Sequence, residues 1–281
     1  SLVFFSVLIS TYFISSCKKK ETKQTSDTTI PNTPTLPISD SIFEIVSHND
    51  VGFTATNRKV VVFGIPIYAY SDVEDNKLLH AANIMAQYLD NDEDGTVDNQ
   101  ILLTTLTSNN AALYLWKNEN QIGTINAQDL GADESIPEWH TNGHTGQFDA
   151  ALEEVWHVIT HSGYSNAYPN VFGEQAGSSL CIAMDSARGG NFTNIPNSYP
   201  TNAWYSYDDA TCTYDCMATE YIYWAMTSIL GAQENRLSEI QQEWKLNTLI
   251  KVQNTDTRIY NLLTNSTYKL PTALPDGSYK H

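Results

Sequence analysis

The amino-acid sequence predicts a mainly helical α+β fold, a single α-rich domain with one or two short strands and a helix–loop–helix calcium loop. Three observations predict it. Residues 58–70 (RKVVVFGIPIYAY) are rich in β-branched and aromatic side chains, as in a strand, with a break at Pro66. Apolar residues then recur at helical spacing over residues 76–89. A run of alternating acids, residues 90–98, follows that helix directly.

Helical patterns also dominate the rest of the chain. The pattern is less regular just after the acidic run and is strongest in a long aromatic helix in the second half. The predicted helices after the acidic run span about residues 101–116, 148–161, 174–187, 214–230 and 236–251. No internal repeat is visible, so residues 40–281 are predicted to form the globular, metal-binding domain.

The N-terminal residues form an apolar leader. Residues 2–14 (LVFFSVLISTYFI) carry no charge, have the length of a secretory h-region and fall short of the roughly 20 residues that a spanning helix needs. They run into Ile14-Ser15-Ser16-Cys17, which resembles the lipobox of bacterial lipoproteins. The resemblance implies a signal peptide over residues 1–16 and a lipid on Cys17, which would anchor the exported protein to a bacterial membrane, in the periplasm or at the cell surface.

The alternative for the leader, a buried N-terminal helix, is disfavoured by the three lysines that follow at once. Residues 17–39 are rich in Lys, Thr and Pro and hold few large apolar groups, so we expect a lipidated flexible tether. The domain that follows carries 11 basic against 30 acidic residues. Such a surface repels nucleic acid, and it suits an exported protein in salty or calcium-containing surroundings.

Three cysteines remain once Cys17 is assigned to lipid. Cys212 and Cys216 would close a small loop in an oxidising compartment, and we predict a disulfide between them. A zinc knuckle would need a second pair of ligands nearby. Cys181 is predicted to be a buried free thiol.

The acidic run between the first two helices has the spacing of a calcium loop. Carboxylates at alternate positions direct oxygens toward one centre, and Gly95 at the sixth position permits the sharp turn. The run resembles an EF-hand or a related DxDxDG loop. The expected ligands are Asp90, Asp92, Asp94, the carbonyl oxygen of Thr96, and Asp98 directly or through water.

This loop departs from an EF-hand at its twelfth position, where Ile101 replaces the bidentate Glu. The loop therefore binds weakly or takes a ligand from elsewhere in the fold. A structural calcium is favoured over a sensor, because an exported protein meets roughly constant calcium. The alternative is an acidic, solvated turn.

A second group of ligand-type residues lies on one predicted helix. At 100° per residue Glu153, Glu154, His157 and His161 fall within one stripe, while apolar residues occupy the other side. Two histidines at i and i+4 have the spacing by which imidazoles reach one metal ion, as in zincin peptidases. The alternative is a solvated face with satisfied histidines.

The resemblance to gluzincin-type zinc peptidases is partial, because the acids precede His157 instead of following it as in HExxH. Glu220 lies 59 residues after His161 on the aromatic helix, much as gluzincins place their third ligand. A carboxylate among such side chains must be paired or bound to a cation. The alternatives for Glu220 are an ion pair with Arg188 or Arg236, or a hydrogen-bonded cap.

These patterns favour a calcium-stabilised, zinc-dependent hydrolase, a peptidase in preference to other hydrolases. Its zinc, or another transition metal, would be held by His157, His161 and Glu220, with Glu154 or Glu153 as the general base. The alternative function is a non-catalytic surface module that binds glycan or peptide. His140 and His144 are weaker ligand candidates, and His80 has the pattern of a core residue.

Overall fold

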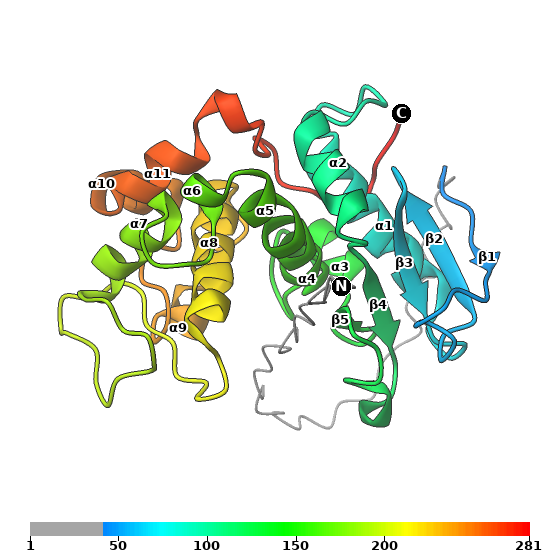
Figure 1. Cartoon of the computed structure of the whole chain (residues 1–281), viewed down its shortest axis with the longest axis horizontal. Coiled ribbons are helices and arrows are strands. Elements are labelled where there is room, and N and C mark those ends of the chain that lie inside the picture. Colours follow the sequence, from blue (N-terminus) through cyan, green and yellow to red (C-terminus); the bar gives the residue numbers. More distant parts are fainter. Residues whose placement is uncertain (1–41) are drawn as a thin grey trace, which may run out of the picture.

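The computed structural model describes residues 42–281, so the predicted signal peptide, Cys17 and the tether lie outside the described residues. Within this range the strands form one mixed sheet in the order β1-β2-β3-β4-β5, seen in Figure 1 beside a larger helical region. The first three strands pair antiparallel and the last three parallel. Their bounds are β1 Val46–Ser47, β2 Arg58–Val62, β3 Ile65–Ala69, β4 Leu113–Trp116 and β5 Gln128–Gly131.

The β2–β3 hairpin turns at Phe63 and Gly64, which both have positive φ as a tight two-residue turn requires. The predicted break at Pro66 is therefore wrong by two residues, since Pro66 lies inside β3 opposite Val61. Alternate residues of the hairpin face the core, where Val60 and its neighbours on that face are buried.

Helix α1, Asp75–Leu89, packs against this core face of β2 and β3. Helix α2, Gln100–Ser108, begins where the Asn99 side chain accepts a hydrogen bond from the Leu102 amide. The helix predicted over residues 101–116 is wrong in its second half. The apolar run that ends it is β4, which is buried between two parallel neighbours except at Trp116, and such strands lack the alternation that would have revealed them.

Helix α4, Ala151–His157, packs between α1 and α8 and carries Glu153, Glu154 and His157 of the predicted stripe. It continues directly into a π-helix, η2, over Val158–Tyr164, and then into α5, Ser165–Ala167. Helix α8, Tyr214–Ile229, is buried along most of its length. An all-round apolar helix of this kind is expected at the centre of a domain.

The remaining helices surround α8 and the end of the sheet. The predicted helix 236–251 is wrong as one unit: it splits into α9 and α10, because the Trp244 backbone bridges to Tyr205 between them. The predicted helix 174–187 begins later, where Ser178 caps the amide of Cys181. The bounds are α3 Pro137–Thr141, α6 Pro169–Phe172, α7 Ser179–Arg188, α9 Leu237–Ile240, α10 Leu249–Thr255 and α11 Thr257–Leu263, with short 3-10 turns at Glu119–Gln121 and Ser266–Tyr268.

The last residues, 270–281, return to α1 and are called the C-terminal strap below; Figure 1 shows this end in red near α1. The Gln87 side chain accepts hydrogen bonds from the amides of Asp276 and Gly277 at 2.9 and 2.8 Å. The Asn91 side chain accepts from the amides of Thr272 and Ala273. The strap thus fixes the end of α1 and the acidic loop that follows it.

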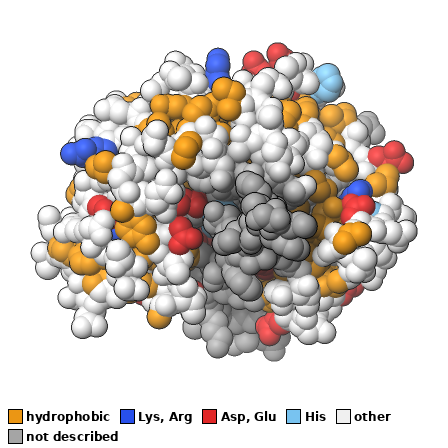
Figure 2. All heavy atoms as spheres, viewed as in Figure 1, with side chains coloured by type: hydrophobic (Ala, Val, Ile, Leu, Met, Phe, Trp, Pro, Cys, Tyr) orange, Lys and Arg blue, Asp and Glu red, His pale blue; other side chains and the backbone are white. Residues whose placement is uncertain are grey.

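The prediction of a mainly helical α+β domain is confirmed, with a larger sheet than the one or two strands expected. Within residues 42–281, no helix combines the length and apolar character needed to span a membrane. Figure 2 shows acidic side chains spread over the visible face and few basic ones, as the net charge of −17 leads one to expect.

Candidate metal centres

Three predicted residues converge between α4 and α8. Glu153 and His157 on α4 and Glu220 on α8 each place a potential ligand atom within 4.8 Å of the others. The Nε2 atom of His157 lies 3.9 Å from Oε2 of Glu220. Only 4% of His157 and 3% of Glu220 is exposed, whereas Glu153 is partly exposed, so water can reach the group only from the side of Glu153.

The charges of this group are poorly compensated by the residues around it. Burial raises the pKa of Glu220 to about 8 and that of Glu153 to about 7, with His157 opposing both shifts. The Tyr223 hydroxyl donates a hydrogen bond to Glu153. His157 Nε2 is buried and has no hydrogen-bond partner. Two carboxyls and an unpartnered imidazole nitrogen within 4.8 Å of one another could together hold a cation.

Glu154 lies beside this group without belonging to it. Its Oε2 accepts a hydrogen bond from the Gln128 side chain of β5 at 2.5 Å and lies 3.6 Å from His157 Nδ1. Its side chain is 20% exposed, against 5% for His157. Burial raises the pKa of Glu154 well above its usual value, and Asp129 nearby adds to the shift. Glu154 is therefore a carboxyl with a strongly raised pKa at the edge of this group.

His161 is not brought into the group. Its Nδ1 lies 2.6 Å from Oε2 of Glu174, and the other oxygen of Glu174 accepts a hydrogen bond from Thr219 at 2.7 Å. The reason is the π-helix that starts at Val158, because i→i+5 hydrogen bonding turns the chain less per residue than the α-helix assumed for the stripe.

Of the predicted ligands His157, His161 and Glu220, the structure therefore assembles the first and the last. Glu153, which the sequence suggested as a base, stands in the place expected for His161. The signal for this was present, since Glu153 precedes His157 by four residues with Glu154 next to it. That is the spacing of HExxH with Glu in place of the first His. Glu174 carried no signal in the sequence.

The two arginines considered as partners of Glu220 are engaged elsewhere. Arg188 is buried and lies 2.7 Å from Asp185 in its own helix. Arg236 lies 3.1 Å from Glu239 and stacks over the Phe148 ring. Glu220 thus sits beside the imidazole of His157 rather than in an ion pair with an arginine.

The acidic loop brings together Asp90, Asp92 and Asp94, whose carboxylate oxygens lie within 4.8 Å of one another. Asp90 is fully buried, and its oxygens accept hydrogen bonds from the amides of Asp94 and Gly95. Gly95 has a φ of +86°, as the sharp turn requires. These oxygens are the hard ligands that calcium prefers.

The other end of the loop differs from an EF-hand. Ile101, on α2, is 59% exposed and offers no ligand. One carboxylate oxygen of Asp98 accepts a hydrogen bond from the Asn91 amide at 2.9 Å. The C-terminal strap covers the loop instead, because the Tyr279 hydroxyl donates to Asp90 and the Lys280 amide donates to Glu93. Thr96 lies in the loop as expected, with its amide bonded to Asp94.

Cys212 and Cys216 form a disulfide just before and at the start of α8, the helix that carries Glu220. Cys181 is a buried free thiol in α7. The disulfide therefore ties the beginning of α8 to the loop that precedes it.

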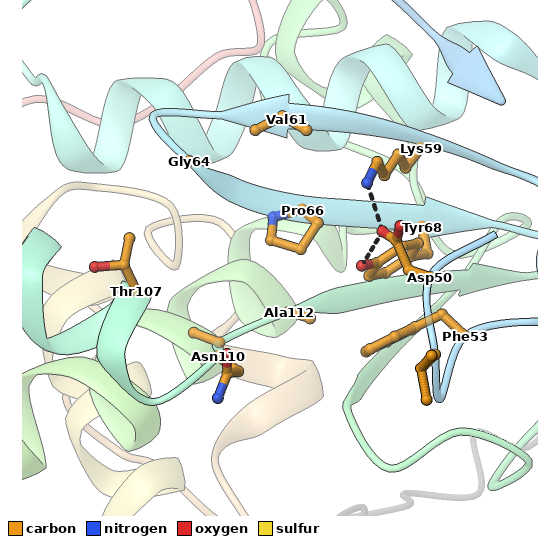
Figure 3. Close-up of a pocket in the computed structure, with 12 residues that line it drawn as sticks. Asp50, Phe53, Lys59, Val61, Gly64, Pro66, Tyr68, Thr107, Asn110 and Ala112 are labelled. Atoms are coloured by element: carbon orange, nitrogen blue, oxygen red, sulfur yellow. Dashed lines mark hydrogen bonds and ion pairs between the residues drawn. The ribbon is translucent and has the colours of Figure 1, made fainter. Parts of the chain in front are cut away.

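A pocket of about 420 Å³ lies on the face of the sheet opposite α1 (Figure 3). Asp50 accepts hydrogen bonds there from Lys59 and, at 2.8 Å, from the Tyr68 hydroxyl. The Phe53 ring stacks on Tyr68 with 3.9 Å between ring centres. The other lining residues include Val61, Pro66, Thr107, Asn110 and Ala112. The pocket thus combines aromatic and apolar walls with a few polar groups.

The chain matches no protein-family model, and no curated protein or solved structure is significantly similar to it.

Proposed function

We propose that the protein is a zinc-dependent hydrolase that cleaves peptide bonds, with its metal held by Glu153, His157 and Glu220. One observation carries the proposal: a buried imidazole nitrogen without a partner lies near two carboxyls from separate helices, the buried Glu220 and the partly exposed Glu153. Catalytic zinc sites use three protein ligands of these types and keep a further position for water or substrate. Manganese or iron would also accept this donor set.

The surrounding residues suit this chemistry. A zinc ion at this position would act as a Lewis acid and lower the pKa of bound water. Glu154 would accept the proton of the attacking water, and the Gln128 amide would hold the Glu154 carboxylate in one orientation. Tyr223 would hold Glu153, the ligand that replaces the first His of HExxH.

We further propose that calcium occupies the loop of Asp90, Asp92 and Asp94 and stabilises the fold by binding only the native state. The Cys212–Cys216 disulfide supports an oxidising compartment, and the lipobox-like sequence ending at Cys17 supports a lipid anchor on a bacterial membrane. The anchored domain would then act on extracytoplasmic peptides.

Metal analysis of the purified protein, in the presence of calcium, tests the zinc site. We expect His157→Ala to remove about one zinc per chain while the circular dichroism spectrum is unchanged. His161→Ala is the matched control. It also removes an imidazole from this helical segment, but that imidazole is paired with Glu174 and lies outside the group. Equal loss of zinc from both variants, or no zinc in the wild type, would refute this ligand set.

The pocket beside Asp50, Lys59 and Tyr68 favours a second function, the binding of a small glycan or peptide without catalysis. Aromatic walls with a few polar groups are typical of such sites. A glycan and peptide binding screen with wild type and Tyr68→Ala tests it. Binding that is lost in Tyr68→Ala but retained in His157→Ala would establish the pocket as a ligand site independent of the metal.

A further inference from the structure

We propose a second transition-metal site at His80, His140 and Asp149, which does not depend on the proposed hydrolase function. The Nε2 atom of His80 lies 2.7 Å, and that of His140 2.8 Å, from the same oxygen of Asp149, Oδ2. His80 comes from α1, His140 from α3, and Asp149 from the loop before α4. Imidazole nitrogen and carboxylate oxygen suit zinc and the neighbouring divalent ions, and not calcium.

The carboxylate of Asp149 is held ready for such a role. Asp149 is fully buried. Its other oxygen, Oδ1, accepts hydrogen bonds from the backbone amides of Ile136 at 2.8 Å and Ala151 at 3.2 Å. Metal-ligating carboxylates are oriented in this way by hydrogen bonds from outside the ligand set. Oδ2 is left to face the two imidazoles.

The two imidazoles present a nitrogen each to one carboxylate oxygen, because both Nε2 atoms lie at Asp149 Oδ2. The side chains of His80, His140 and Asp149 are 5%, 3% and 0% exposed, so bulk water does not reach this point. A divalent cation bound between the two nitrogens and Asp149 Oδ2 would take the place of the two hydrogen bonds.

The present distances are close to those of a metal site. With zinc bonds of about 2.0–2.2 Å, neighbouring tetrahedral ligand atoms lie roughly 3.4 Å apart. The two imidazole nitrogens, now 2.7 and 2.8 Å from Asp149 Oδ2, would need to withdraw by less than about 1 Å. Side-chain rotation on α1 and α3 can supply that movement without changing the backbone.

The site lies where several segments meet, which indicates a structural role. A Cβ atom added to Gly277 would lie 2.2 Å from His80 Nδ1, so the C-terminal strap runs directly against the His80 ring. The strap is also hydrogen-bonded to Gln87, which lies about two turns after His80 on α1. Helix α3 has five residues and is too short to be stable alone. A metal here would join α1, α3 and the strap.

Zinc content after removal of metal and reloading with zinc in excess calcium tests the proposal. The His140→Asn variant keeps a group that can donate to Asp149 but is a poor zinc ligand. His144→Asn is the matched control, because His144 stacks on Trp139 and does not belong to the donor group. We expect His140→Asn to bind one zinc fewer than the wild type, and His144→Asn to bind as many.

The outcomes separate this site from the Glu153 group. Loss of one zinc in both His140→Asn and His157→Ala supports two sites, whereas loss in His140→Asn alone supports only the new one. Unchanged zinc content in folded His140→Asn overturns the proposal. If that variant does not fold, His157→Ala decides: one retained zinc with two imidazole ligands by X-ray absorption supports the site, and no zinc overturns it.

Discussion

Replacing Glu220 by Gln separates the cost of a buried acid from its use as a ligand. In metal-free protein Glu220 must take up a proton to fold near neutral pH, because burial raises its pKa to about 8 from 4.5. A raised carboxyl pKa means that stability is highest below pH 4.5 and falls, as pH rises toward 8, by about 1.4 kcal/mol per unit. Between pH 4.5 and 7 this group lowers the free energy of unfolding by roughly 3 kcal/mol. Solvent screening reduces this effect little, because Glu220 is only 3% exposed.

Glu220→Gln removes that loss, so metal-free variant protein at pH 7 should be more stable than the wild type by about 3 kcal/mol. Zinc at a hundred times its dissociation constant for the Glu153 group should stabilise the wild type by about 2.7 kcal/mol more than the variant, which keeps only the proposed His80 site. Urea unfolding at pH 5, 6, 7 and 8 measures both, with a zinc-selective chelator or added zinc. The control Glu239→Gln changes an exposed acid and should have little effect. Destabilisation of the metal-free variant, or a zinc stabilisation as large as that of the wild type, would refute the reasoning.

Three further predictions concern neighbouring residues. Glu154→Gln should retain zinc but lower kcat for peptide cleavage by about 10²–10⁴-fold, measured on a peptide library; unchanged kcat would exclude Glu154 as the base. The hydrogen bond that His161 donates to Glu174 raises the pKa of His161, so the stability it adds is complete below pH 6.5 and is lost at higher pH. Glu174→Gln should flatten that decline in thermal unfolding between pH 6 and 9, and an unchanged profile would contradict it. Gln87→Ala should free the C-terminal strap, lower stability by roughly 2–4 kcal/mol and weaken calcium binding by calorimetry; full calcium affinity would show that the strap does not support the loop.

The elements that the sequence predicted well are those with strong local patterns. Helix α1 and the acidic loop after it follow from spacing and from Gly95, and α8 follows from a long apolar run. Strand β4 could not be predicted, because its four residues lack alternation and pair only with segments far away in the chain. The strap carries no periodic signal, since side chains of α1 and the acidic loop determine its path.

The candidate site shows the same division between local and tertiary causes. Residue type and helical spacing predicted the stripe of acids and histidines. They also predicted that Glu220 is a buried acid. The change from α- to π-helix after His157 was not, because it depends on how η2 packs against α2 and α8. That change directs His161 to Glu174 and leaves Glu153 as the residue that meets His157 and Glu220.

The substitution of Glu for an imidazole at this position has a chemical consequence. Two carboxylates and one neutral imidazole would cancel the charge of a divalent ion, whereas two imidazoles and one carboxylate leave a net positive charge. A neutral centre withdraws less electron density from bound water, so the pKa of that water stays closer to its value on the free ion. It also shifts the donor set toward oxygen, which favours manganese or iron more than an imidazole-rich set does. The burial of Glu220 reinforces this, because a low-dielectric environment strengthens the attraction between its carboxylate and the ion and so neutralises the ion more fully. Metal analysis that finds manganese or iron in place of zinc would therefore agree with the exchange of an imidazole for Glu153.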